Sequence, residues 1–125
     1  MSDLPAMLAQ FHAGFGQAFE DGGSGRLARV RLHEGEHREL VEALASLDDV
    51  AIAHELADVV YVAYGTAHSL GIDLDLAVRL VHEANMRKAG PDGRFTLDEH
   101  GKVVKPPGFV PADVSTAVLT SWVET

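Results

Sequence analysis

Apolar residues recur at helical spacing over most of the chain. They return every three or four positions between Asp3 and Glu20, and again over residues 26–47, 50–70 and 73–88. Turn-forming residues separate the four stretches, as expected where one helix ends and the next begins. The pattern therefore predicts an all-α fold, and an antiparallel four-helix bundle is the simplest way to bury these helices against one another.

Polar turn residues mark the expected ends of the helices. Residues 21–25, Asp-Gly-Gly-Ser-Gly, break the chain after the first helix, and Asp48-Asp49 form a turn between the second and the third. Gly71 is a suitable C-terminal cap for the third helix, and Asp73 is a suitable N-terminal cap for the fourth. Each predicted helix is thus bounded by residues that favour its start or its end.

The last third of the chain follows a different pattern. Residues 95–97 and 102–105 flank a polar turn at 98–101, which predicts a short hairpin. Three prolines then predict an extended arm, and a short helix is expected to begin near Asp113. The chain has neither a low-complexity region nor an inter-domain linker, so residues 1–125 are predicted to form a single domain.

The composition is that of one small soluble domain. A hydrophobic fraction of 46% in 125 residues is enough for a packed core. No run approaches the roughly 18 apolar residues of a membrane span, and no basic-then-apolar secretion signal opens the chain. We therefore expect a cytoplasmic protein that does not enter a membrane. The absence of cysteine excludes a disulfide framework, a thiol nucleophile and a zinc–thiolate site.

The net charge of −9 argues against a general nucleic-acid binder, because such a protein presents a basic face. The charge is also uneven along the chain. No lysine or arginine occurs between Glu39 and Val78, whereas basic residues gather in the last third. A nucleotide ligand fits this distribution, since a divalent cation can mediate between carboxylates and phosphates.

Two pairs of acids stand at matching places in the second and third predicted helices. Glu36 and Glu39 form one pair, Glu55 and Asp58 the other, and residues three apart lie on one helix face. Both pairs fall in or beside the apolar arc of their helix, so four carboxylates are expected to point toward the buried side. Unpaired buried charges are costly, and a hard ion such as Mg²⁺ or Mn²⁺ would neutralise them. A single pair would more simply be exposed; two pairs in phase favour a metal site.

The motif Glu36-x-x-Glu39, 15 residues, then Glu55-x-x-Asp58 resembles the defining motif of the all-α nucleoside triphosphate pyrophosphohydrolases. That superfamily includes MazG, the dimeric dUTPases and phosphoribosyl-ATP pyrophosphohydrolase. The resemblance continues through residues 55–62, 71–73, 81–88 and 101–106, and covers most of the chain from Leu27 to Val114. It implies a single domain of this type, cleavage between the α and β phosphates that depends on Mg²⁺ or Mn²⁺, and a homodimer or homotetramer that completes the bundle.

The resemblance also implies roles for individual residues. The expected metal ligands are Glu36, Glu39, Glu55 and Asp58, and Glu36 is the expected catalytic base. Asn85, Lys88, Lys102 and Lys105 are the expected nucleotide-binding residues, since an amide can pair with a sugar or base and lysines attract phosphate. Without the resemblance, a helix cap with a dipole-complementing lysine and solvated edge-strand lysines would be the simpler interpretations.

One position departs from the superfamily pattern. Relatives commonly have two adjacent acids at the start of the motif, where this chain has Gly35-Glu36. We expect an enzyme that removes dUTP or another noncanonical or surplus deoxynucleoside triphosphate from the nucleotide pool. Two alternatives stay open: a phosphoribosyl-ATP pyrophosphohydrolase, and a nucleotide-binding module whose turnover is reduced or lost because of Gly35.

Overall fold

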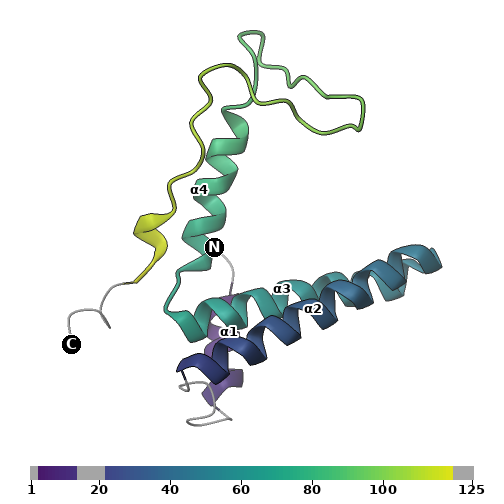
Figure 1. Cartoon of the computed structure of the whole chain (residues 1–125), viewed down its shortest axis with the longest axis vertical. Helices are drawn as coiled ribbons and strands as arrows, with labels where there is room; N and C mark the ends of the chain where they lie inside the picture. The colour runs from purple at the N-terminus through teal and green to yellow at the C-terminus, as the bar shows by residue number, and fades with distance from the viewer. Residues whose placement is uncertain (1–2, 14–21, 120–125) are drawn as a thin grey trace. The chain divides into compact units, whose positions relative to one another are not determined.

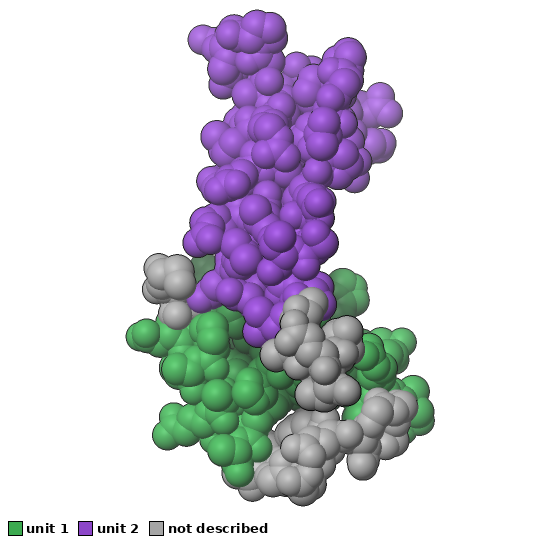
Figure 2. All heavy atoms as spheres, turned by 90° about the vertical axis from the view of Figure 1, so that its left-hand side faces the viewer, with its two compact units in different colours: residues 1–72 green, residues 73–125 purple. Residues whose placement is uncertain are grey.

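The computed structural model describes residues 3–13 and 22–119, and it confirms the all-α prediction for them. Its helices are α1 (Leu4–Ala13), α2 (Gly22–Ser46), α3 (Asp49–Leu70) and α4 (Leu74–Met86), followed by the 3₁₀ turn η2 (Ser115–Ala117) (Figure 1). Within these residues, none of the helices combines the length and the apolar character that crossing a membrane requires. The chain divides into two compact units, residues 1–72 and 73–125 (Figure 2).

The helix ends follow from the residues expected to form them. The Asp48 side chain caps α3 by accepting hydrogen bonds from two backbone N–H groups of the first turn. Gly71 ends α3 in the left-handed conformation, with φ of 69°, and its N–H bonds back to helix carbonyls. Asp73 caps α4 by accepting from the N–H of Leu76. Leu47 closes α2 at φ of 60°, which is uncommon for a residue with a large side chain.

In the first unit, α2 and α3 form a helical hairpin and α1 packs against α3 (Figure 1). Leu8, Ala43 and Ala67 are its buried apolar residues, and the contact of α1 with α3 includes an edge-to-face pair of Phe11 and Tyr61. Gly65 lies at the tightest point. A Cβ there would lie only 3.1 Å from the guanidinium of Arg29, so glycine permits the close approach of the three helices.

Polar side chains join the three helices around Gly65. Buried Arg29 of α2 lies 3.3 Å from Nε2 of buried His12 of α1, and 3.4 Å from the hydroxyl of Thr66 of α3. His33 Nε2 lies 2.7 Å from the same hydroxyl. Since each contact crosses between helices, this network fixes which faces of α1, α2 and α3 meet.

The second unit consists of α4, the segment that follows it, and η2. Ala84 and Ala117 are buried, and the N–H of Asp73 bonds to the carbonyl of Ala117. The predicted hairpin is reduced to one isolated antiparallel bridge between Leu97 and Val103. The Asp98 carboxylate closes the turn by accepting from two backbone N–H groups, and the prolines that follow cannot extend the ladder because they lack an N–H.

Two predicted boundaries differ from the structure, and a third is not tested by it. Residues 22–25 were expected to break the chain, yet α2 begins at Gly22. Once a helix has formed, each added residue gains a backbone hydrogen bond, and this gain offsets the helix-propensity cost of about 1 kcal/mol for each glycine. The short helix expected near Asp113 is only the 3₁₀ turn η2. The expected end of the first helix, residues 14–20, lies outside the described residues. The four-helix arrangement completed by oligomerisation, and a single domain over 1–125, stay predictions.

Candidate functional site

Four carboxylates come together on the hairpin of α2 and α3. One oxygen each from Glu36, Glu39, Glu55 and Asp58 lies within 4.8 Å of the others. The three-residue spacing places each pair on one helix face, and the packing of α2 on α3 brings the two faces opposite each other. Glu39 is exposed, whereas the other three are partly buried. The structure thus brings together the two acidic pairs that the sequence analysis selected.

Burial and the repulsion between neighbouring carboxylates raise the pKa of two acids in the cluster. Burial raises the pKa of the Glu36 carboxyl above its ordinary value, and the carboxylates of Glu39 and Asp58 raise it further. Burial and the carboxylates of Glu39 and Asp58 also raise the pKa of Glu55, and the neighbouring His54 offsets part of this rise. Each of these two groups therefore holds a proton more readily than an isolated glutamate does.

Two oxygens in the cluster are shielded from solvent without a hydrogen-bond donor. They are Oε2 of Glu36 and Oε1 of Glu55, which have no partner among the described residues. Such orphaned acceptors are costly unless a proton or a cation satisfies them. An all-oxygen donor set of four carboxylates suits a hard divalent ion such as Mg²⁺ or Mn²⁺.

His54 is a neighbour of the cluster that the sequence analysis missed. Its Nε2 lies 3.2 Å from Oδ2 of Asp58, one helical turn away, and His54, Glu55 and Asp58 make a second group able to hold a metal. An imidazole suits transition metals better than Mg²⁺. The i, i+4 spacing from His54 to Asp58 is the sequence signal that could have identified this contact.

Gly35 has room for a side chain. A Cβ on this residue would meet only the end of the Arg38 side chain, at 3.9 Å. The position where relatives commonly have a second acid can therefore take a side chain without a clash. The absence of that acid is a property of the sequence and not a consequence of crowding.

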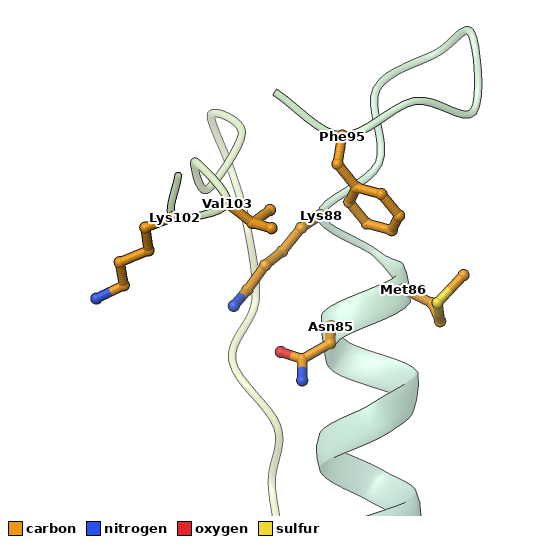
Figure 3. A pocket seen from close by; sticks show the side chains of 6 residues that line it. All are labelled: Asn85, Met86, Lys88, Phe95, Lys102 and Val103. Carbon is orange, nitrogen blue, oxygen red and sulfur yellow. The ribbon is translucent and has the colours of Figure 1, made fainter. Parts of the chain in front are cut away.

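The second unit contains a pocket of about 340 Å³ at the C-terminal end of α4. Its lining consists of Asn85, Met86, Lys88, Phe95, Lys102 and Val103 (Figure 3). Three residues expected to bind nucleotide, Asn85, Lys88 and Lys102, thus share one cavity. Lys105, the fourth, is exposed and is not part of the lining. The Lys88 ammonium lies 5.5 Å from the centre of the Phe109 ring, a cation–π distance.

The pocket depends on how the chain reverses after α4. The bridge between Leu97 and Val103 brings residues 102 and 103 back beside the segment that carries Phe95. The sequence analysis missed Met86, Phe95 and Val103 as lining residues. Their apolar character alone gives no signal, because only the chain reversal brings them to the same cavity.

Comparison with protein families gives a match over the helical part of the chain. Residues 17–85 match the model of the phosphoribosyl-ATP pyrophosphohydrolase family, which is more than half of the chain. The match includes both acidic pairs and extends to Asn85. Among curated proteins, none matches the chain closely enough to count as a relative.

Proposed function

The chain belongs to the phosphoribosyl-ATP pyrophosphohydrolase family, within the MazG-like superfamily, and on this premise we propose that it is a metal-dependent nucleoside triphosphate pyrophosphohydrolase. The proposed reaction cleaves a nucleoside triphosphate between its α and β phosphates, giving the monophosphate and pyrophosphate. The observation that carries the proposal is the cluster of four carboxylates within 4.8 Å on α2 and α3.

The proposed metal ligands are Glu36, Glu39, Glu55 and Asp58. The two shielded oxygens without a donor and the oxygen-only donor set support a hard ion, Mg²⁺ or its substitute Mn²⁺. Held there, the ion would supply positive charge to the phosphate oxygens and lower the pKa of a bound water.

Glu36 is the proposed general base. The assignment follows the superfamily resemblance: a carboxylate oxygen of the cluster that does not coordinate the ion can accept the proton of a bound water. In the proposed step, Glu36 takes one proton from the attacking water. The water oxygen forms a new bond to phosphorus, and the bond between phosphorus and the bridging oxygen breaks. The bridging oxygen leaves with the departing product.

Asn85, Lys88, Lys102 and Lys105 are the proposed nucleotide-binding residues. The shared cavity of Asn85, Lys88 and Lys102 supports this assignment, since it joins an amide that can pair with a sugar or base to two ammonium groups that attract phosphate. Lys105 is exposed on the arm beyond the pocket. Its proposed role is to meet the phosphates from that arm.

The proposed substrate is dUTP or another noncanonical or surplus deoxynucleoside triphosphate. The description of the matching family favours a second candidate, phosphoribosyl-ATP, whose hydrolysis breaks the same kind of bond. A third candidate follows from Gly35: a nucleotide-binding module in which turnover is reduced or lost because one acid of the superfamily pattern is missing.

One assay separates the three candidates. The protein is incubated with ribo- and deoxynucleoside triphosphates, dUTP among them, and with phosphoribosyl-ATP, with Mg²⁺ or Mn²⁺, and pyrophosphate release is measured. We expect release from at least one deoxynucleoside triphosphate. Release from phosphoribosyl-ATP alone would select the second candidate, and saturable nucleotide binding without release would select the third.

Gly35→Glu is measured beside the wild type. The open space around Gly35 accommodates the added side chain, so this variant tests the missing acid rather than the fold. Higher turnover would show that the absence of the acid limits the reaction. Unchanged turnover would show that the four existing carboxylates suffice.

A further inference from the structure

The pocket at the end of α4 has two chemically different sides. Phe95, Met86 and Val103 supply apolar surface, while Asn85, Lys88 and Lys102 supply nitrogen donors. In Figure 3 the Phe95 ring and the Met86 side chain lie to one side, the nitrogens of Asn85, Lys88 and Lys102 point to the other, and Val103 lies between Lys88 and Lys102. A ligand that fills this pocket therefore meets apolar surface at one end and positive charge at the other.

A nucleotide has the same division. Its base is a flat ring with apolar faces, and its phosphates are negatively charged. The chain has a net charge of −9, yet two lysines line this one pocket, so the pocket has the opposite charge to the chain as a whole. A negatively charged polyphosphate is a ligand that complements this local positive charge. The volume of about 340 Å³ is at the lower end of the range of small-molecule sites.

The Phe95 ring is available as a platform. It is 41% exposed, so it is not a core residue of its unit, yet it lines the cavity. Aromatic side chains that bind bases stack on their faces, and stacking tolerates any base because every base has a π face. Phe109, the other described aromatic ring of this unit, instead lies against the Lys88 ammonium.

We infer that Phe95 is the base-stacking residue of the nucleotide site, with Met86 beside it, and that Lys88 and Lys102 hold the phosphates of the same ligand. The inference rests on the proposed function, because it deepens the nucleotide site named there. Asn85 also lines the pocket, and its amide offers a donor and an acceptor to the sugar or the edge of the base.

Binding of two kinds of probe tests this division. The first kind is the set of α,β-imido analogues of dUTP and the four common deoxynucleoside triphosphates, which resist cleavage at that bond. The second is inorganic triphosphate, which has the charge without the base. Calorimetric titration of the full chain with Mg²⁺ gives an affinity for each probe, independent of turnover.

Phe95→Leu keeps an apolar side chain and removes the π face. We expect the tightest imido-nucleotide to bind about tenfold more weakly to this variant, a loss typical of one base–aromatic stack, while inorganic triphosphate binds as before. Phe95→Tyr keeps the ring and should restore nucleotide binding. The matched control Phe109→Leu removes the ring beside Lys88, and it should change both affinities in equal proportion.

A second variant tests the pocket without touching Phe95. Met86 is 51% exposed at the end of α4, so Met86→Ala removes apolar surface from the cavity without leaving a hole in a core. We expect it to weaken imido-nucleotide binding and to spare inorganic triphosphate.

The outcomes separate the inference from the proposed function. If Phe95→Leu weakens both kinds of probe equally, or neither, the inference is wrong while the proposed function stands. If the wild type binds inorganic triphosphate as tightly as every imido-nucleotide, the base has no pocket and the inference is again wrong. If the wild type binds no probe at all, the proposed function fails together with it.

Discussion

At the scale of single residues, the acid cluster is the part of the molecule where a small chemical change has the largest expected effect. Glu36 and Glu55 each contain a shielded oxygen without a donor, and the neighbouring carboxylates repel them. Without a cation this arrangement is costly for the fold, whereas the proposed cation would turn the same oxygens into ligands. If the cluster is the metal site, we expect stability to rise with metal binding.

Replacing one acid should separate these two effects. We expect Glu55→Gln to raise the melting temperature of the metal-free protein, because it removes a repelled charge, and to abolish both the stabilisation by Mg²⁺ and the metal-dependent activity. Asp58→Asn should abolish the activity in the same way. Differential scanning calorimetry with and without Mg²⁺ and a pyrophosphate assay provide the measurements.

Glu42→Gln is the matched control, since Glu42 is exposed on α2 and is not in the cluster. It should keep both the activity and the thermal shift with Mg²⁺. Full metal-dependent activity in Glu55→Gln would contradict the assignment of the cluster as the metal site.

His12 gives the first unit a dependence on pH. Arginine only donates, so the 3.3 Å contact with Arg29 Nη2 requires His12 Nε2 to be an unprotonated acceptor. Burial lowers the pKa of His12 below its ordinary value of 6.5, and the charges of Arg29 and His68 lower it further. His33 lies on the same network through Thr66.

The unfolded chain consequently binds a proton at His12 more readily than the folded chain does. The contribution of neutral His12 to the free energy of unfolding is present above about pH 6.5, the pKa of histidine in the unfolded chain, and is lost as the pH falls below that value. We expect the free energy of unfolding by urea to decrease from pH 7.5 to 5.5, and His12→Gln, which cannot gain this charge, to show a smaller decrease. An equal decrease in the variant would assign the effect to other groups.

At the scale of helices, two glycines in helix interiors differ in the space around them. Gly65 of α3 is crowded, since an added Cβ would lie 3.1 Å from Arg29 Nη1 and from His12 Nε2. Both side chains are buried and joined to each other, so neither can yield easily. Gly35 of α2 faces open space.

The same substitution should therefore change stability in opposite directions. Gly65→Ala is expected to lower the free energy of unfolding by about 1 kcal/mol, because overpacking of about 2 kcal/mol exceeds the gain in helix propensity of about 1 kcal/mol. Gly35→Ala is expected to raise it by up to about 1 kcal/mol. Chemical denaturation measures both, and a stabilised Gly65→Ala would show that the network can relax.

At the scale of the whole molecule, apolar side chains remain on the outside of the helical hairpin. Val41 and Leu44 of α2 are about half exposed, at 51% and 50%, and Leu56 and Val60 of α3 are similar, at 48% and 43%. Leu8 is the largest side chain that is fully buried among the described residues. A monomer rarely leaves so much apolar surface in water, which supports the proposed homodimer or homotetramer.

A charge within this surface should disrupt the assembly. We expect the wild type to sediment as a dimer or tetramer at micromolar concentration, and Leu44→Lys to sediment as a smaller species. Glu42→Lys is the control on the same helix, because it changes more charge at a polar position and should leave the assembly intact. A monomeric wild type in analytical ultracentrifugation would contradict the proposal.

The sequence by itself determined the helices and the faces that carry their chemistry. Periodicity, the aspartate caps and Gly71 placed α3 and α4 to within a few residues, and the three-residue spacing put each acidic pair on one face. These are local properties, since they depend on residues within one or two turns of each other. The family resemblance was available from the same segments.

Only the tertiary structure decided which distant residues meet. The burial of Arg29 against His12 and the entry of Phe95 into a cavity with Lys88 depend on how the chain reverses between elements. The meeting of the two acidic pairs was expected from their matching phase, and the structure adds that they lie within 4.8 Å of each other. Contacts between elements depend on packing and chain reversal, and a local pattern of residue types does not contain that information.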